Sequence, residues 1–237
     1  MPSITIKNEE FTYPTLEELR KIRTDRPRLK KFGFPYVHEI PELLQNIAGM
    51  EDVARRSHLH WWDHCLVNRI GSLNHAYTTA LVHYNRGLPD DIKDYRPEHY
   101  VNRVQFGYYG ETYFYFFMSV RDTIVQLVNV YFSMGIPEKK LHLNKELPKK
   151  IPNQQVGELF TQFLTDTELT SEYRNGLAHR FLITHDDNRP SINYDKGGMM
   201  FEAGTGDAIT SSELMAEIKR SMLCMAKFLD DLHPLMK

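Results

Sequence analysis

The chain has 237 residues, which is enough for one large domain or two small ones with a hydrophobic core. Hydrophobic residues make up 41% of the sequence and charged residues 25%, proportions that exclude disordered, collagen-like and disulfide-stapled proteins. The formal net charge is -2, which excludes a protein that coats nucleic acid over its whole surface, because such proteins are strongly basic.

The sequence predicts a cytoplasmic protein without a membrane partner. Residues 1–10 lack the basic-then-apolar pattern of a signal peptide. The most apolar run, 113–120, is about eight residues long, whereas a membrane-spanning helix needs about 20. Cys65 and Cys224 fall inside helical patterns and away from metal-ligand spacings, as expected for reduced, small apolar side chains.

Residues 1–40 are predicted to form an N-terminal arm with one short helix. Thr15 and Glu18 have the spacing of a capping box, which opens a helix that runs to about Arg23. The segment 20–31 contains seven basic residues and one acidic residue, so it carries +6 and leaves -8 for the rest of the chain. Such a segment is either solvated or a strip that grips phosphates, and the second interpretation selects Arg26, Arg28, Lys30 and Lys31 as RNA-binding residues.

Residues 41–237 are predicted to form an all-α antiparallel bundle of four to five long helices. The first helix covers about 41–86, with a break near Gly49 and a bend near Gly71. Its apolar residues recur at steps of three and four, which is typical of a buried helix face: Leu59, Trp62, Leu66, Ile70, Leu73, Tyr77 and Leu81.

A second helix, from about 107 to 133, is apolar around most of its circumference, which is typical of the centre of a bundle. Its polar residues form one narrow strip: Glu111, Ser119, Asp122, Gln126, Asn129 and Ser133. After a lysine-rich connector, helices are expected at about 156–164, at 168–179 and from Thr210 onward, where Glu213 completes a capping box. Short strand patterns between the last two helices predict a small β-hairpin insertion at 181–205.

Two histidines raise the possibility of a metal site. His60 and His64 stand four residues apart on one helix, a spacing that places two imidazoles on one ion. His75 is about 16 Å further along the helix axis and cannot join them. No third ligand is evident from the sequence, so exposed histidines remain the alternative.

The segment 173–181 contains the most informative pair of residues. Arg174 and His179 are five residues apart, which corresponds on a helix to about 140° of rotation and 7.5 Å of rise. Asn175 and Gly176 between them form a dipeptide that commonly ends helices. One interpretation is therefore a helix that stops at Asn175, with Arg174 in its last turn and His179 in the next segment.

The second interpretation comes from a resemblance. The pattern of Arg174, Asn175 and His179 resembles the Arg-Asn-x-x-x-His signature of the HEPN superfamily, whose members are antiparallel helical bundles that usually form dimers. The helices expected between 107 and 235 resemble the rest of such a bundle. This resemblance implies a metal-independent endoribonuclease without a cofactor, active as a homodimer in a defence or toxin–antitoxin setting.

The resemblance also implies roles for particular residues. His179 would act as general acid or base and Arg174 would clamp the phosphate, since their side chains suit proton transfer and anionic oxygens, respectively. Asn175 would orient His179 or the phosphate, Asp122 would hold His179 in its productive tautomer, and Arg180 would add positive charge. Because the 140° separation keeps one helix from converging both groups, a dimer that pools two motifs is expected.

Two alternatives remain open at this point. Many HEPN relatives lack nuclease activity, so the chain is alternatively a noncatalytic nucleotide- or partner-binding dimer, with a nucleotidyltransferase-like antitoxin as the implied partner. The third hypothesis is a helical bundle that binds a metal or small ligand through His60 and His64.

Overall fold

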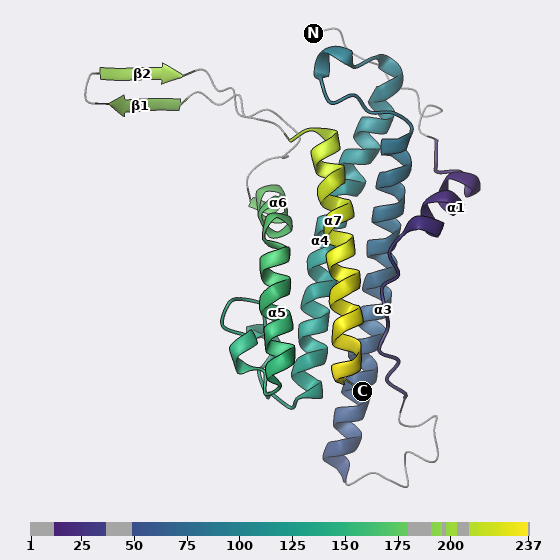
Figure 1. Ribbon diagram of the computed structural model, residues 1–237, viewed down its shortest axis with the longest axis vertical. Helices are drawn as coiled ribbons and strands as arrows, with labels where there is room; N and C mark the ends of the chain where they lie inside the picture. The colour runs from purple at the N-terminus through teal and green to yellow at the C-terminus, as the bar shows by residue number, and fades with distance from the viewer. Residues whose placement is uncertain (1–11, 37–48, 180–190, 196–197, 203–208, 237) are drawn as a thin grey trace.

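The computed structural model describes residues 12–36, 49–179, 191–195, 198–202 and 209–236 (Figure 1). Helices account for most of them, which confirms the all-α class. The α-helices are α1 (Leu16–Asp25), α3 (Met50–Asn85), α4 (Pro97–Tyr131), α5 (Gln154–Asp166), α6 (Glu168–His179) and α7 (Ser211–Leu232). Short 3-10 turns lie at η2 (Ile92–Asp94), η3 (Glu138–Lys140), η4 (Pro148–Lys150) and η5 (His233–Met236). None of the described helices is long and apolar enough to cross a membrane.

Helices α3 and α4 form a long antiparallel pair that runs the length of the molecule (Figure 1). The apolar face predicted for α3 is buried against α4, except that Trp62 remains half-exposed. Helix α3 continues without interruption through Gly71, the residue near which the sequence predicts a bend. Gly71 is exposed and adopts helical geometry, so the backbone freedom that glycine loses makes the helix less favourable there without stopping it.

Helix α4 begins at Pro97, ten residues earlier than the sequence pattern predicts. Proline at the first helical position is favourable because its missing N–H has no partner there in any helix. The first ten residues bury only Val101 and Phe106, so they carry too weak an apolar pattern to be recognised. At Gly110, α4 packs closely against α7, since a Cβ there would lie 3.4 Å from Leu214 Cδ2 of α7.

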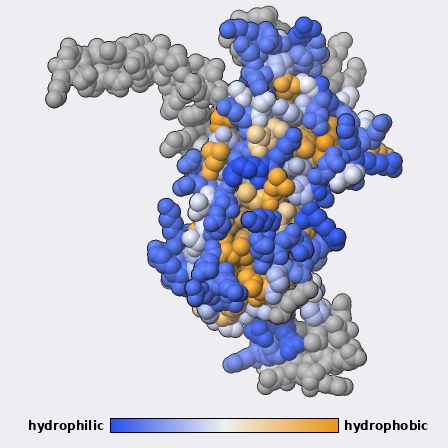
Figure 2. Space-filling model, viewed as in Figure 1, coloured by the Kyte–Doolittle hydropathy of each residue, from blue (hydrophilic) through white to orange (hydrophobic). Residues whose placement is uncertain are grey.

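Helices α5, α6 and α7 pack on the α3–α4 pair through aromatic and aliphatic side chains. Phe228 of α7 stacks on Phe163 of α5 with ring centroids 4.2 Å apart, and Phe163 also stacks on Phe117 of α4. The capping box predicted at Thr210 and Glu213 opens α7. On the face shown in Figure 2, hydrophobic residues form a broken band down the middle of the bundle, and hydrophilic residues cover both ends.

Between α6 and α7, two strands form a two-stranded antiparallel sheet. Strand β1 (Ser191–Asp195) pairs with β2 (Gly198–Glu202) in a register that sets Ser191 opposite Glu202. Both strands fall inside the range 181–205 assigned to an insertion. The further strand pattern at 181–184 lies outside the described residues.

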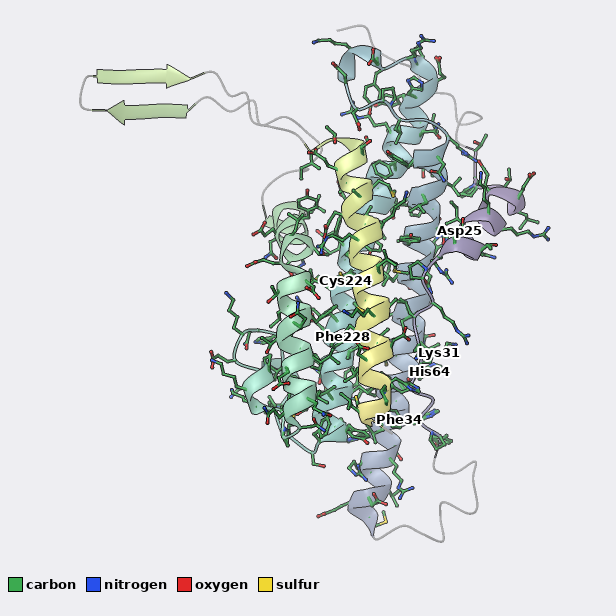
Figure 3. The ribbon with its side chains drawn as sticks, viewed as in Figure 1. Asp25, Lys31, Phe34, His64, Cys224 and Phe228 are labelled. Atoms are coloured by element: carbon green, nitrogen blue, oxygen red, sulfur yellow. The ribbon has the colours of Figure 1, made fainter. Side chains whose placement is uncertain are left out.

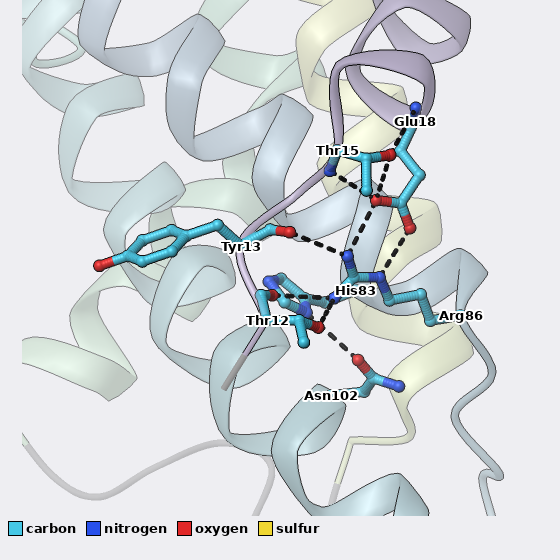
Figure 4. A network of polar contacts seen from close by, with 7 residues as sticks. All are labelled: Thr12, Tyr13, Thr15, Glu18, His83, Arg86 and Asn102. Atoms are coloured by element: carbon cyan, nitrogen blue, oxygen red, sulfur yellow. Dashed lines mark hydrogen bonds and ion pairs between the residues drawn. The ribbon is translucent and has the colours of Figure 1, made fainter. Parts of the chain in front are cut away.

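The described part of the N-terminal arm, 12–36, packs against the bundle. The capping box predicted at Thr15 and Glu18 is present, and α1 extends to Asp25. Arg86, just after α3, holds the arm by a forked pair to Glu18 (2.7 and 2.8 Å) and by donating to the backbone oxygens of Thr12 and Tyr13 (Figure 4). Beneath this cluster, buried His83 hydrogen-bonds to the Asn102 side chain, and burial lowers the pKa of its imidazole.

After α1, the arm runs along α3 toward the C-terminal end of α7. Ile22 and Leu29 are buried in the common core, and the Phe32 ring stacks on His233 at 5.8 Å. Lys30 forms an ion pair with Asp230 of α7 at 3.0 Å. Figure 3 shows Lys31 and Phe34 alongside the lower half of the bundle. The basic segment is therefore laid along the bundle surface rather than extended into solvent.

Candidate functional site

Helix α6 carries the whole Arg174–His179 pattern. It runs without interruption through Asn175 and Gly176 and ends at His179, so the interpretation that a helix stops at Asn175 is wrong. The 140° of rotation and 7.5 Å of rise between Arg174 and His179 therefore apply to one continuous helix. The His179 side chain and all of Arg180 lie outside the described residues.

The Arg174 side chain is half-buried and oriented by its neighbour. One terminal nitrogen, Nη1, donates to the Asn175 Oδ1 oxygen at 3.0 Å. The Nε atom is buried and finds no acceptor among the described residues. A buried N–H without a partner costs free energy, so the guanidinium retains an unused donor for an acceptor from outside the described chain.

Contacts from two neighbouring helices fix the position of α6. The Tyr173 ring meets Phe114 of α4 edge to face at 5.8 Å, and burial raises the pKa of the Tyr173 hydroxyl. The Thr170 hydroxyl donates to the buried Glu217 carboxylate of α7. Arg220 forms an ion pair with that carboxylate, with 2.7 Å between its Nε and Glu217 Oε2. It also donates a hydrogen bond to a backbone oxygen at the end of α5. The helix that carries Arg174 is thus anchored by its N-terminal half.

The structure does not bring Asp122 to the motif within one chain. Its carboxylate is exposed and forms an ion pair with the neighbouring Arg121 at 3.0 Å. Helices α4 and α6 are antiparallel, and Phe114 and Tyr173 stand at the same level (Figure 1). At 1.5 Å per residue, Asp122 lies about 12 Å from this level in one direction and His179 about 9 Å in the other, so about 21 Å separate them along the axis.

Glu111 is an acidic residue closer to the motif that sequence reasoning did not select. It lies on α4 about 4.5 Å from Phe114 toward the end of α6 that carries His179. Burial raises the pKa of its carboxyl group, and no hydrogen bond or ion pair reaches it within the described part of the chain. The sequence places Glu111 on the polar strip of its helix. It does not predict which part of α4 lies next to α6.

The basic residues of the arm lie elsewhere on the molecule. Lys30 pairs with Asp230, and Arg28 and Lys31 are exposed. Arg26 is half-buried, and burial lowers the pKa of its guanidinium. Asp230 is 13 residues below Glu217 on α7, a distance of about 20 Å along the helix, so these side chains and Arg174 form separate regions of one chain.

The two histidines of the metal hypothesis are not joined by further ligands. His60 bonds through Nδ1 to the Phe34 backbone oxygen at 2.9 Å, and its ring packs on Tyr36. His64 is exposed. Among the described residues, no group of three or more His, Cys, Asp or Glu side chains is placed to hold a metal ion. The structure instead gives His60 a role in holding the arm.

Comparison with known proteins places the helical bundle in a family. No curated protein and no solved structure matches the chain. Residues 62–234, about three quarters of the sequence, match the family model described as Cthe2314-like HEPN. The matched range includes α4 to α7 and the Arg174–His179 pattern, and it omits the N-terminal arm and the start of α3. The chain therefore belongs to this family of HEPN domains.

Proposed function

We propose that the chain is a metal-independent endoribonuclease that acts as a homodimer. The observation that carries this proposal is the continuous helix α6, which combines the Arg–His signature with an oriented Arg174 guanidinium whose buried Nε donor has no acceptor among the described residues. A phosphate oxygen is the type of acceptor that such a donor takes most strongly. In this proposal, residues 1–40 form an arm and residues 41–237 form the HEPN unit.

The chemistry needs no metal or cofactor. Attack of the ribose 2′-hydroxyl on the adjacent phosphorus requires a base for the 2′ proton and an acid for the leaving 5′ oxygen. His179 supplies the proton transfer because an imidazole titrates near neutral pH. Arg174 stabilises the charge that develops on the phosphorane oxygens, and Asn175 holds the guanidinium in place. The products are a 2′,3′-cyclic phosphate and a 5′-hydroxyl end.

A second copy of the chain completes the site in this proposal. Arg174 and His179 of one chain are about 140° apart around α6, so one helix does not direct both at the same phosphate. Beside α6, helix α4 exposes Val104, Tyr108 and Tyr115, whose spacing places them on one helix face. Exposed apolar side chains grouped in this way favour a protein partner, and a two-fold axis there would bring two α6 helices together.

The proposed partners are RNA and, in a cytoplasmic toxin–antitoxin setting, a nucleotidyltransferase-like antitoxin. Arg28 and Lys31 are exposed and carry no ion pair within the described residues, so they are suited to contact RNA phosphates at a distance from the cleavage site. Contacts of this kind would let a chain of net charge -2 hold a polyanion through the basic segment 20–31.

The test is cleavage of an end-labelled structured RNA by purified protein in EDTA. We expect fragments with 2′,3′-cyclic phosphate ends, and we expect His179→Ala to lower the rate at least about 100-fold, since it removes the acid–base group. His142→Ala, an exposed histidine in the connector after α4, is the control and should retain full activity. Equal rates for His179→Ala and the wild type, or loss of cleavage in EDTA, would refute the assignment. Stable RNA binding without turnover by the wild type would favour the noncatalytic dimer.

A further inference from the structure

A hollow of about 460 Å³ lies between the arm, the start of α3 and the end of α4. Its walls are Phe34, Pro35, Arg55, Arg56, Leu59 and Tyr131. This volume falls in the range of sites that hold small molecules. Five of the six lining residues precede residue 62, so the hollow lies almost entirely outside the region that matches the HEPN family.

Phe34 and Pro35 of the arm form part of the apolar wall of the hollow, and α3 holds this part of the arm in place. The buried Asp63 carboxylate accepts hydrogen bonds from the Gly33 and Phe34 backbone nitrogens at 2.8 and 3.0 Å. Gly33 turns the chain with a φ of 74°, a conformation that favours glycine. The Phe34 ring then lies 6.0 Å from the Tyr131 ring, with the two planes inclined at 45° (Figure 3 shows Phe34). Two aromatic rings therefore line the hollow before any ligand arrives.

The other part of the lining contains two arginines of α3. Arg55 and Arg56 both pair with the Asp52 carboxylate, at 3.1 and 2.9 Å. Among the described residues, these two guanidinium groups share one carboxylate, which leaves one positive charge. Each guanidinium has five N–H donors and gives one to Asp52, so several donors on each remain for an anion. The shared carboxylate fixes the orientation of both side chains at the start of α3.

We propose that this hollow binds a small anion that carries a flat aromatic ring, of the size and chemistry of a mononucleotide. The ring lies against Phe34 and Tyr131, because aromatic side chains stack on bases of any sequence. The phosphate accepts from Arg55 and Arg56, whose planar donors match its oxygens. The hollow is about 35 Å along the bundle from the level of His179, so the site is separate from the proposed cleavage site.

The chain has two tryptophans whose fluorescence can be followed as a ligand is added. Trp61 and Trp62 lie within one helical turn of Leu59 on α3, and there are no others. The experiment titrates the full-length protein with AMP, adenosine and inorganic phosphate, with tryptophan fluorescence and calorimetry as readouts. We expect AMP to bind at least about tenfold more tightly than adenosine or phosphate, because only AMP engages both walls.

Variants separate the two walls. The double variant Arg55→Gln, Arg56→Gln should weaken AMP binding at least about tenfold and leave adenosine binding unchanged, since charge-assisted hydrogen bonds are lost. Phe34→Leu keeps an apolar side chain and should weaken AMP and adenosine but not phosphate. Arg69→Gln, an exposed arginine further along α3, is the matched control and should bind AMP like the wild type. The proposal is overturned if AMP binds no more tightly than phosphate, or if the double variant, folded as judged by its melting temperature, binds AMP normally.

Discussion

At the scale of single residues, some polar side chains near α6 have hydrogen-bond or ion-pair partners among the described residues, and others do not. Glu217 is buried but receives Arg220 and Thr170, so its charge is balanced. Arg174 and Glu111 are half-buried, and each keeps polar atoms without a partner among the described residues. Since unpaired polar groups cost stability, their presence at the same end of α6 is most simply explained by function.

The variant Glu111→Gln separates the effect of Glu111 on the stability of the protein from its effect on RNA cleavage. Burial raises the pKa of Glu111, so the folded state disfavours its charge and loses stability as the pH rises above the ordinary value of 4.5. We therefore expect the glutamine variant to melt about 1 °C higher at pH 7, with the difference vanishing below about pH 4. If Glu111 positions the site, RNA cleavage should fall about three- to tenfold.

Asp122→Asn is the matched comparison for Glu111→Gln. Its carboxylate is exposed and paired with Arg121 on the same helix, so cleavage should stay near the wild-type rate. Loss of cleavage in Asp122→Asn together with normal cleavage in Glu111→Gln would reverse the assignment of the acidic residue.

At the scale of elements, the arm and helix α6 are held by different polar clusters. The arm depends on Arg86 at the end of α3, which joins Glu18 to the backbone of Thr12 and Tyr13 (Figure 4). The Arg86 guanidinium lowers the pKa of Glu18 to about 2. Both side chains are partly exposed, so the pair is worth on the order of 1 kcal/mol after solvent screening.

Acid and the variant Arg86→Gln should release the arm in the same way. Because the pKa of Glu18 is lowered from 4.5 to about 2, its stabilisation is complete above about pH 4.5 and is lost as the pH falls toward 2. At pH 7, Arg86→Gln should speed hydrogen exchange in 12–36 and lower the melting temperature by about 2–4 °C. Arg69→Gln should change neither. Unchanged exchange in 12–36 of Arg86→Gln would show that the arm is held by its apolar contacts alone.

The sequence predicts those parts of the fold that residues close together in the chain determine. The capping boxes at Thr15 and Thr210 and the apolar face of α3 were predicted because neighbouring residues determine them. Helix α6 continues through Asn175 and Gly176, and Leu177 beyond them packs against the core, so tertiary packing outweighs the local preference to stop. The separation of Asp122 from α6 depends on the axial register of two antiparallel helices, which one sequence does not contain. The same holds for the hollow, whose walls come from three separate segments, with Phe34, Arg55 and Tyr131 as representatives.

At the scale of the whole molecule, the proposals place distinct tasks at the two ends of the bundle. Helix α6, which carries the HEPN signature, lies in the upper half of the molecule in Figure 1 and contacts α4, which exposes Val104, Tyr108 and Tyr115. The arm, its basic residues and the nucleotide-sized hollow lie along α3 and the lower end. The family match covers α4 to α7 and begins at residue 62, so it does not include the arm or most of the residues that line the hollow.

The most direct test of the central claim is complementation between two inactive variants. Arg174→Ala and His179→Ala should each abolish cleavage as homodimers. If Arg174 of one protomer acts with His179 of its partner, co-expressed variants will form heterodimers that retain one of two Arg–His pairs. Random pairing then predicts recovery of about a quarter of the wild-type rate in EDTA. Isolated heterodimers that are as inactive as the two homodimers would contradict a cleavage site shared between two copies of α6.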